Sequence, residues 1–216
     1  MAMPSDTSSP TRRRTRRKQD RPAEIVEAAL RLFSDRGFAA TKLEDVAAAA
    51  GIGKGTIYLY FPTKEHLFRA VVRQAVLPNL DAVAAMLADP NLAAADILRA
   101  MAERFLQLVD TDLTAIPRLV LAESGNFPAI ARFYAEEVVY KGMALIRSVL
   151  ARGIERGEFR PVDLDGALPL FSAPLMLVAL WKHSLGRHTD IQLDARKVVA
   201  THLDVLLRGL AADPPS

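Results

Sequence analysis

The sequence predicts an all-α protein, with three short helices near the N-terminus and a larger helical domain after them. From Arg21 onward, apolar residues recur at spacings of three and four, which is the period of an amphipathic helix. Alternating runs of Val, Ile and Thr, which would indicate strands, do not occur. Gly37, Gly51 and Pro62 end short helical segments before residue 63, and the segments after it are longer and more apolar.

Composition excludes several classes of protein. The chain has 216 residues and no cysteine, which rules out disulfides and thiolate metal sites. No run approaches about 18 consecutive apolar residues, and no apolar stretch follows the basic N-terminus. We therefore expect a cytoplasmic protein with no membrane span and no secretory signal.

Charge is unevenly distributed along the chain. Residues 1–71 hold 13 Lys/Arg and 8 Asp/Glu, a balance of +5, whereas residues 72–216 hold 15 and 17, a balance of −2. A positive front suggests that a polyanion meets this part of the protein. An ordinary solvated surface is the alternative.

The first 19 residues predict a disordered basic tail. The stretch "TRRRTRRK" carries six basic groups in eight positions with nothing to bury. Such a run suits contact with phosphates or entry into a DNA minor groove. A solubilising tail is the alternative.

The first two helices can be delimited by their end signals. Pro22 suits a first helical turn, and Gly37 suits the position just after a helix. The next helix is expected to begin at Thr41, because "TKLE" matches a capping box in which Glu44 reaches back to Thr41. The apolar face of the first helix comprises Ile25, Ala29, Leu32 and Phe33.

A third helix is predicted over 54–60, and Thr63 is expected to cap a fourth that begins at Lys64. The second and third helices are joined by Gly51-Ile52-Gly53, and two short helices across such a turn form the helix-turn-helix pattern. Later helices are expected near 64–88, 92–109, 112–123, 128–156, 164–185 and 194–210, with prolines kinking some of them.

The third helix mixes residue types in a way that suits a DNA groove. Small residues at its start let the backbone approach, and Lys54 is a long donor that can reach guanine. Ile57 and Phe61 face inward with Val46 and Leu67. The "GKGT" run is not a phosphate loop, because the spacing differs and a helix precedes it.

Residues 21–68 resemble the DNA-binding domain of TetR-type transcriptional regulators. The resemblance lies in "EIVEAALRLFSDRGFAATKLEDVA" followed by "AAAAGIGKGTIYLYFPTKEHLF". It implies a homodimeric all-α protein that reads the major groove of a palindromic operator with its third helix. It also implies three parts: a tail (1–19), a helix-turn-helix domain (20–66), and a ligand-binding and dimerisation domain (67–216).

The resemblance also implies roles for individual residues. It implies phosphate contacts from Thr41, Tyr58, Tyr60 and Lys64. It implies base-reading or close groove contacts from Lys42, Lys54, Gly55 and Thr56. Many members have Ser where this chain has Gly53, so a Ser–phosphate bond is absent, and we expect Lys54 and the basic tail to compensate.

The last two helices are expected to form the dimer interface. The stretch "LPLFSAPLMLVALW" is apolar nearly all round and must be covered on every side. Pairing with a second copy would cover it and would give a two-fold assembly; a core within one chain is the alternative. The stripe on the final helix comprises Val198, Val199, His202, Leu203, Leu206, Leu207 and Leu210.

A small-molecule pocket is expected between the middle helices and the dimer-forming pair. The segment 118–138 also resembles part of the C-terminal domains of regulators related to multidrug-efflux control. Candidate ligand-binding residues are Phe105, Arg118, Phe127, Phe133, Met176 and Trp181, with Leu119, Tyr134, Arg104, Glu123 and His183 as further candidates.

We therefore expect a repressor that an unknown small molecule releases from its operator. An enzyme is the main rival class, but no HExxH, GxSxG or paired Asp/Glu motif occurs, and we assign no catalytic residue, cofactor or metal. The sequence leaves two further hypotheses open, which are a metal site at His183, His188 and Asp190 and a DNA-binding or scaffold protein that responds to no ligand.

Overall fold

The structure, a computed structural model, describes residues 10–212, and side chains from residue 21 onward. Helices make up nearly all of this part, as predicted, and its one β-type contact is an isolated bridge between Phe159 and Ala211. The α-helices are α1 (Pro10–Arg36), α2 (Leu43–Ala49), α3 (Lys54–Tyr60), α4 (Lys64–Val71), α5 (Leu77–Ala88), α6 (Ala94–Leu108), α7 (Ile116–Glu123), α8 (Pro128–Tyr134), α9 (Tyr140–Glu155), α10 (Leu164–His183) and α11 (Ala195–Leu210). Short segments of other helical types are η1 (Val72–Val76), η2 (Asp112–Ala115), η3 (Ala135–Val139) and η4 (Leu185–Arg187).

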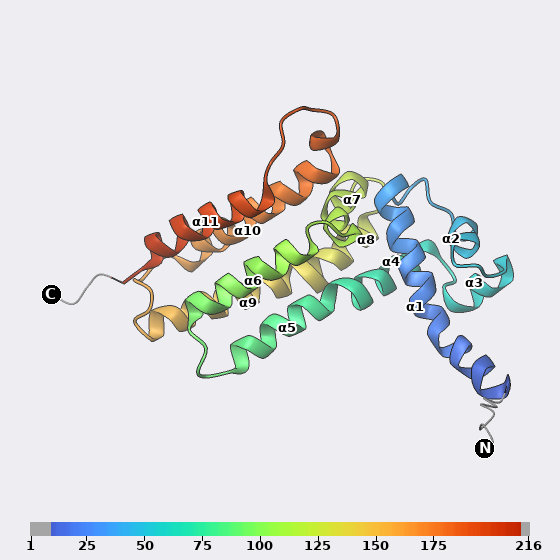
Figure 1. Cartoon of the computed structure of the whole chain (residues 1–216), viewed down its shortest axis with the longest axis horizontal. Helices are drawn as coiled ribbons and strands as arrows, with labels where there is room; N and C mark the ends of the chain where they lie inside the picture. Colours follow the sequence, from blue (N-terminus) through green and yellow to red (C-terminus); the bar gives the residue numbers. More distant parts are fainter. Residues whose placement is uncertain (1–9, 213–216) are drawn as a thin grey trace, which may run out of the picture.

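The first helix begins earlier than predicted. Residues 10–19, which we expected to be disordered, continue α1 toward the N-terminus, while residues 1–9 of the predicted tail lie outside the described residues. Neither Gly nor Pro occurs between Thr11 and Arg21, and Arg and Lys favour helix. Pro22 therefore lies inside α1, not at its start. Figure 1 shows this part of α1 projecting away from the rest of the molecule.

The N-terminal helices form the predicted helix-turn-helix, with one change at a cap. The predicted capping box at Thr41 and Glu44 is wrong by one residue: Lys42 is the N-cap of α2, and Asp45 accepts its main-chain N–H. Three other end signals are confirmed, since Gly37 and Gly51 have positive φ and Thr63 caps α4.

An aromatic cluster holds the helix-turn-helix together. The rings of Phe33, Phe38 and Phe68 lie 5.4 to 6.3 Å apart, and all three are buried. Val46, Ile57, Phe61 and Leu67 are buried as predicted. The same core continues into α7 and α8, so the two predicted domains share packing and the division at residue 66 remains a prediction.

The helix predicted over 64–88 is continuous but changes type in the middle. A π-helical segment, Val72–Val76, separates α4 from α5. Pro78 follows it and lacks the N–H that would continue the ladder. The side-chain amide of Asn79 donates to the carbonyls of Ala75 and Val76, at the junction between the π-helical segment and α5.

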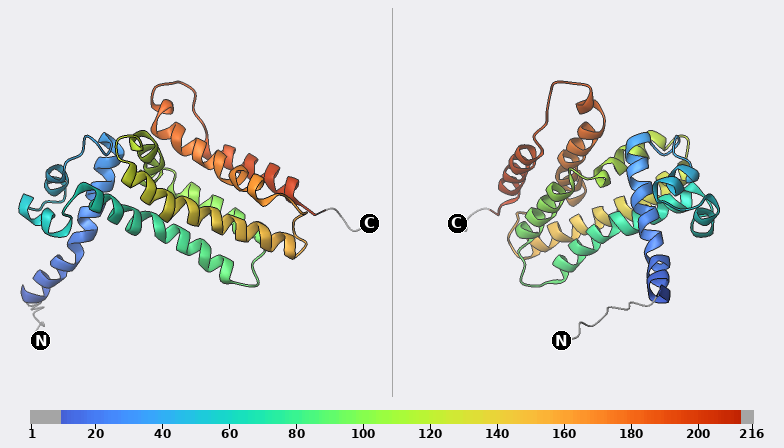
Figure 2. Two further views of the ribbon diagram at one scale, coloured as in Figure 1. Left: turned by 180° about the vertical axis from the view of Figure 1, so that it is seen from behind. Right: turned by 45° about the vertical axis from the view of Figure 1, so that its right-hand side comes forward.

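Helices α5, α6, α9, α10 and α11 lie side by side at the opposite end from α1, α2 and α3. Figures 1 and 2 show α5, α6 and α9 with roughly parallel axes, the chain of α6 running opposite to α5, and α10 and α11 forming an outer pair. A second buried core joins α6, α9 and α10, with Leu98, Val149 and Phe171 among its members. The continuous helical stretch formed by α4, η1 and α5 connects the two ends of the molecule.

Two helical stretches are long and apolar enough to cross a membrane, although counting uninterrupted apolar runs predicted none. They are Lys64–Ala88 and Leu164–Arg187. Only 17% and 28% of the residues in their most apolar windows are buried within the chain. Length and composition alone do not place a helix in lipid, because helices that pack on other helices share both properties.

Candidate DNA-recognition surface and effector pocket

Helix α3 divides into a buried side and an exposed side. Ile57 is fully buried and anchors α3 to the core. Lys54 and Gly55 are exposed at its N-terminal end, Tyr58 is 41% exposed, and Leu59 is 84% exposed. A seven-residue helix held by one side leaves the other side free to enter a groove.

Glu44 of α2 holds two of the exposed α3 side chains in place. Its Oε1 accepts a hydrogen bond from the Tyr58 hydroxyl at 2.9 Å and pairs with Lys54 Nζ at 3.0 Å. A hydrogen bond from the Glu44 main-chain N–H, then those from Lys54 and Tyr58, lower the pKa of Glu44 to about 2. The same contacts raise the pKa of Lys54 and that of Tyr58. Glu44 is therefore ionised, and it orients both side chains before any duplex arrives.

The N-terminal end of α3 is open. A Cβ built on Gly55 meets no atom within 4 Å, and the φ of Gly55 is not positive. Neither packing nor backbone conformation within the chain therefore requires glycine at this position. Thr56 lies half-buried beside Gly53, and Lys42 is exposed where α2 begins.

Three of the residues expected at phosphates are engaged inside the protein. Thr41 is fully buried, and its hydroxyl donates to the carbonyls of Gly37 and Leu32 at 2.8 and 3.3 Å. Tyr60 is half-buried against the core. The prediction that Thr41 contacts a phosphate is therefore wrong, and its role is structural. A buried hydroxyl that already donates to main-chain carbonyls is not accessible to a phosphate.

Lys64 is the third such residue. Its Nζ donates to the carbonyls of Phe38 and Ala39 at 2.6 and 3.0 Å and lies 4.5 Å from the centroid of the Phe38 ring. Burial lowers the pKa of Lys64. Lys64 therefore satisfies carbonyls beyond the end of α1, and a phosphate would have to compete with them.

Glu44 and Leu59 were missed by the sequence reasoning. We expected Glu44 to close a capping box, and nothing local to "TKLE" indicates a partner in the next helix. Leu59 did carry a signal: an apolar residue two positions after the buried Ile57 cannot share its face of α3.

The helical domain contacts the turn between α1 and α2. Glu123, at the end of α7, accepts the main-chain N–H of Ala39 at 2.9 Å. The ring of Phe127 packs edge-on against Phe38 with centroids 4.9 Å apart. These contacts join the DNA-binding unit to the end of α7 and the segment after it.

The predicted ligand-binding residues do not converge on one cavity. Phe127 and Phe133 belong to the N-terminal core, and Arg118 reaches the carbonyl of Ser34 in α1. Phe105 is half-buried on α6, and Met176 is exposed on α10. Of the six, Trp181 lines a pocket between secondary-structure elements of the helical domain.

The pocket beside Trp181 lies between α6, α10 and the start of α11. It has a volume of about 350 Å³. Its apolar wall is formed by Leu106, Val109 and Val178, and charged groups at its edge include Asp110, Lys182 and Arg196. The indole N–H of Trp181 donates to the carbonyl of Ile191 at 3.1 Å. Gly186 has to be small, because a Cβ there would lie 2.7 Å from the indole ring.

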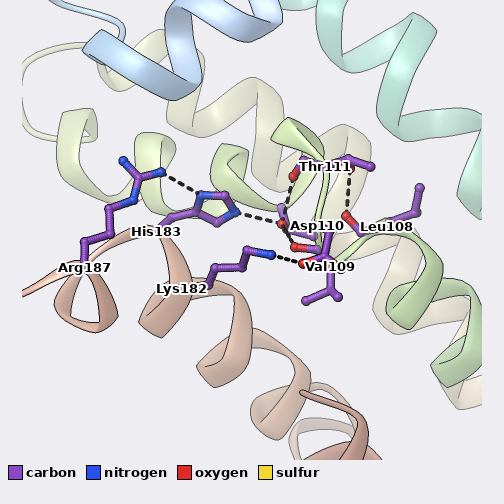
Figure 3. A network of polar contacts seen from close by, with 8 residues as sticks. Leu108, Val109, Asp110, Thr111, Lys182, His183 and Arg187 are labelled. Atoms are coloured by element: carbon purple, nitrogen blue, oxygen red, sulfur yellow. Dashed lines mark hydrogen bonds and ion pairs between the residues drawn. The ribbon is translucent and has the colours of Figure 1, made fainter. Parts of the chain in front are cut away.

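A polar network beside this pocket ties α10 to the segment between α6 and α7 (Figure 3). Lys182 forms an ion pair with Asp110. The buried His183 Nε2 lies 2.8 Å from the Thr114 hydroxyl, and Arg187 lies near its Nδ1. Burial, then the nearby Arg187, lower the pKa of His183. His183 is thus a structural histidine, and among the described residues no cluster of metal-binding side chains occurs.

The outer face of α10 and α11 carries exposed apolar side chains. Leu170 is 60% exposed and Val205 is 65% exposed. They border a groove of about 720 Å³ between the two helices, whose lining also includes Pro174, His202 and Leu206. Of the stripe predicted on the last helix, Val199 and Leu210 are buried and the other five residues are half-buried in the single chain.

Comparison with protein families gives two matches that together span most of the chain. Residues 25–71 match the model of bacterial regulatory proteins of the tetR family. Residues 93–193 match the model of a tetracyclin repressor-like C-terminal domain.

Relatives and solved structures agree with these matches. The chain is 33% identical to the transcriptional regulator RutR of Escherichia coli, over 71% of each chain. It is 27% identical to the transcriptional repressor KstR2 of Rhodococcus jostii, over 90% of this chain and 93% of that protein. The fold matches FadR of Bacillus subtilis, solved with stearoyl-CoA, with a TM-score of 0.72 at 20% identity, over 87% of this chain and 98% of that one. The chain belongs to the TetR family and is a DNA-binding transcriptional regulator.

Proposed function

We propose that this regulator is a cytoplasmic repressor that binds a palindromic operator as a two-fold dimer and leaves it when a small molecule binds. The observation that carries the proposal is the arrangement on α3. Ile57 anchors one side of the helix, while Glu44 sets Lys54 and Tyr58 on the other. A lysine with spare N–H donors beside a tyrosine, both pre-oriented on an exposed helix, suits a DNA groove, because little side-chain freedom is lost on binding.

The exposed residues divide into two kinds of DNA contact. Lys54, Gly55 and Thr56 are placed to approach base edges, and Leu59 offers an apolar surface to a thymine methyl. Lys42 borders this surface and suits a phosphate. Tyr58 also borders it, but its one O–H would first have to leave Glu44. Tyr60 and Lys64 would reach phosphates only after giving up part of their present packing.

A second copy of the chain is the proposed cover for α10 and α11. Leu170 and Val205 flank an open groove, and pairing of two such faces about a two-fold axis buries both. The same symmetry places two copies of α3 against half-sites about 34 Å apart. The proposed dimer also explains why the apolar helix α10 is mostly uncovered in the single chain, because a second copy and not a membrane would cover it.

The pocket beside Trp181 is the proposed effector site. FadR, which shares this fold, is known with stearoyl-CoA bound, and this supports a small-molecule site in the helical domain of the present chain. The pocket adjoins the segment that packs between α10 and α1. A ligand loosens DNA only by preferring the form that does not bind DNA.

Selection of duplexes from a random library by the purified full chain tests the DNA-binding part. We expect an inverted repeat, and Lys54→Gln should weaken binding to it by about 1–3 kcal/mol. Lys141→Gln, which removes a lysine on α9, is the matched control and should bind normally. Failure to enrich any inverted repeat would contradict the proposal.

The dimer is tested by sedimentation of Leu170→Glu. A buried charge on both sides of a two-fold interface should convert the dimer to monomer and weaken operator binding. Leu121→Glu changes an equally exposed leucine on α7 and should remain dimeric. If the Leu170→Glu protein remains dimeric, the dimer interface lies on another surface of the chain.

A further inference from the structure

The charged groups at the Trp181 pocket leave donors without partners. Asp110 pairs with Lys182, and Asp194 accepts the main-chain N–H of Lys197 as the N-cap of α11. Arg196 forms none of the ion pairs found among the described residues. Lys182 has three N–H donors, of which Asp110 takes one. The edge of the pocket therefore has spare cationic donors.

The pocket lining holds two cations, Lys182 and Arg196, and two carboxylates, Asp110 and Asp194, so its formal charges cancel. Both carboxylates already accept hydrogen bonds, Asp110 from Lys182 and Asp194 from the main-chain N–H of Lys197. The pKa of Asp110 is lowered first by the hydrogen bond and charge of Lys182, with a smaller contribution from Arg196. An anionic group that enters the pocket therefore finds spare N–H donors, whereas the acceptors that a cation needs are partly taken.

The opposite wall of the pocket is apolar. Leu106, Val109 and Val178 face it, together with Trp181. The indole N–H is already bonded to Ile191, so Trp181 offers a ligand its ring and not its donor. A volume of about 350 Å³ suits a compact ligand more than a long chain.

We propose that the pocket binds a small monocarboxylate with a compact apolar body. The apolar body lies against Trp181, Val109 and Val178, and the carboxylate takes the free donors of Lys182 and Arg196. This rests on the proposed function, since it names the chemical class of the effector. Asp110 competes with the ligand for Lys182, and the competition is mild because both side chains of that pair are solvent-exposed.

The site is coupled to the DNA-binding unit through the segment that follows Asp110. Thr114 contacts His183 of α10, while Asp112, Ala115 and Ile116 lie against Leu30, Phe33 and Ser34 of α1. A ligand that takes Lys182 from Asp110 removes one tie between α10 and this segment. The Thr114–His183 contact and the packing on α1 remain, so the segment is held less firmly to α10 and can shift against α1.

Binding is measured with three probes of similar size by titration calorimetry and by fluorescence of Trp181, the one tryptophan in the sequence. The probes are 3-phenylpropanoate, hexanoate and the neutral 3-phenylpropanamide. Both carboxylates should bind about tenfold more tightly than the amide, which is the effect of a charge-assisted hydrogen bond. The ratio of the affinities for 3-phenylpropanoate and hexanoate shows whether the pocket prefers an aromatic or an aliphatic body.

Two variants change 3-phenylpropanoate binding in opposite directions. Lys182→Gln should weaken it about tenfold by removing a charged donor. Asp110→Asn should tighten it about two- to fivefold by removing the competitor. The matched controls are Arg99→Gln and Asp96→Asn, which break an exposed ion pair within α6 and should leave binding unchanged.

Equal affinity for the amide and the carboxylates would overturn the proposal, as would weaker binding by Asp110→Asn. Failure of all three probes to bind the wild-type protein would overturn it as well. A wrong proposed function would give a different result. In that case the ligand-free protein would bind no duplex from the random library, whether or not the probes bind beside Trp181.

Discussion

The carboxylate of Glu123 accepts a hydrogen bond from the main-chain N–H of Ala39, with 2.9 Å between oxygen and nitrogen. The two residues are 84 positions apart, at the end of α7 and in the turn between α1 and α2. Lys64 of α4 donates to the carbonyls of Phe38 and Ala39 in the same turn. The turn that leads into the DNA-binding helices is therefore held by hydrogen bonds from both the helical domain and α4.

Glu123→Ala should weaken communication between effector and DNA. Loss of one hydrogen bond to a charged acceptor should cost about 1–3 kcal/mol of stability, while the pocket beside Trp181 remains intact. The drop in operator affinity on effector binding should therefore shrink. Glu103→Ala, an exposed glutamate on α6, is the control. An unchanged effector response would show that coupling runs by another route.

Gly55→Ala should separate stability from function. Alanine at this helical position meets no neighbour and should raise the free energy of unfolding by about 0.5–1 kcal/mol. If the duplex approaches the α3 backbone here, the added methyl group should weaken operator binding at least tenfold. Gly142→Ala, in α9, should stabilise without changing DNA affinity. Unfolding and operator titrations on all three proteins give the answer.

Glu44→Gln should relax DNA specificity. The substitution removes a negative charge from the DNA-facing surface and frees Lys54 to bind any phosphate. Binding to random duplex should tighten, and its slope against the logarithm of salt concentration should steepen by about one unit. The ratio of operator to random affinity should fall. Glu65→Gln, in α4, is the control, and an unchanged ratio would rule out an orienting role for Glu44.

His183 should make stability fall at acid pH. Its pKa is lowered in the folded protein, so the unfolded chain binds more protons once the pH drops below the ordinary histidine value of about 6.5. The stabilisation is complete above that value and is lost as the pH falls through the lowered pKa. His183→Asn should flatten the loss between about pH 7 and 5, although His202, whose pKa is also lowered, keeps part of it. Denaturant unfolding at several pH values measures this, with His188→Gln as the control.

Gly153→Ala should destabilise the helical domain. A Cβ on Gly153 would lie 2.1 Å from the ring of Phe159, which packs directly on this part of α9. Overpacking of this kind should cost about 1–3 kcal/mol. Gly142→Ala lies in the same helix, where the nearest atom of Leu80 is 3.8 Å away, and should not destabilise. Equal unfolding midpoints for the two variants would mean that Phe159 moves aside without cost.

Features that depend on neighbouring residues could be predicted from the sequence. The ends of α3 follow from Gly53 and Pro62, and the start of α4 follows from Thr63. The buried positions Ile57 and Phe61 follow from helical spacing. The prediction of the helix-turn-helix succeeded because its signals lie within a few positions of one another.

Features that depend on distant residues could not be predicted. Nothing near Thr41 shows that its hydroxyl is buried on the carbonyls of α1, and nothing near Phe127 shows that it packs on Phe38. Five of the six proposed ligand residues were chosen for aromatic or charged character, which core residues share. Helix at residues 10–19 was missed because charge density was weighed above the helix propensity of arginine.

The uncovered leucine and valine surface of α10 and α11 also bears on gene dosage. On the proposed dimer, two chains must meet before either can bind its half of an operator. The number of assembled repressors then falls with the square of chain concentration when chains are scarce. A cell that makes half as much protein would lose more than half of its assembled repressors. The rate at which the protein is synthesised, as well as the effector, would therefore determine when the repressed genes are expressed.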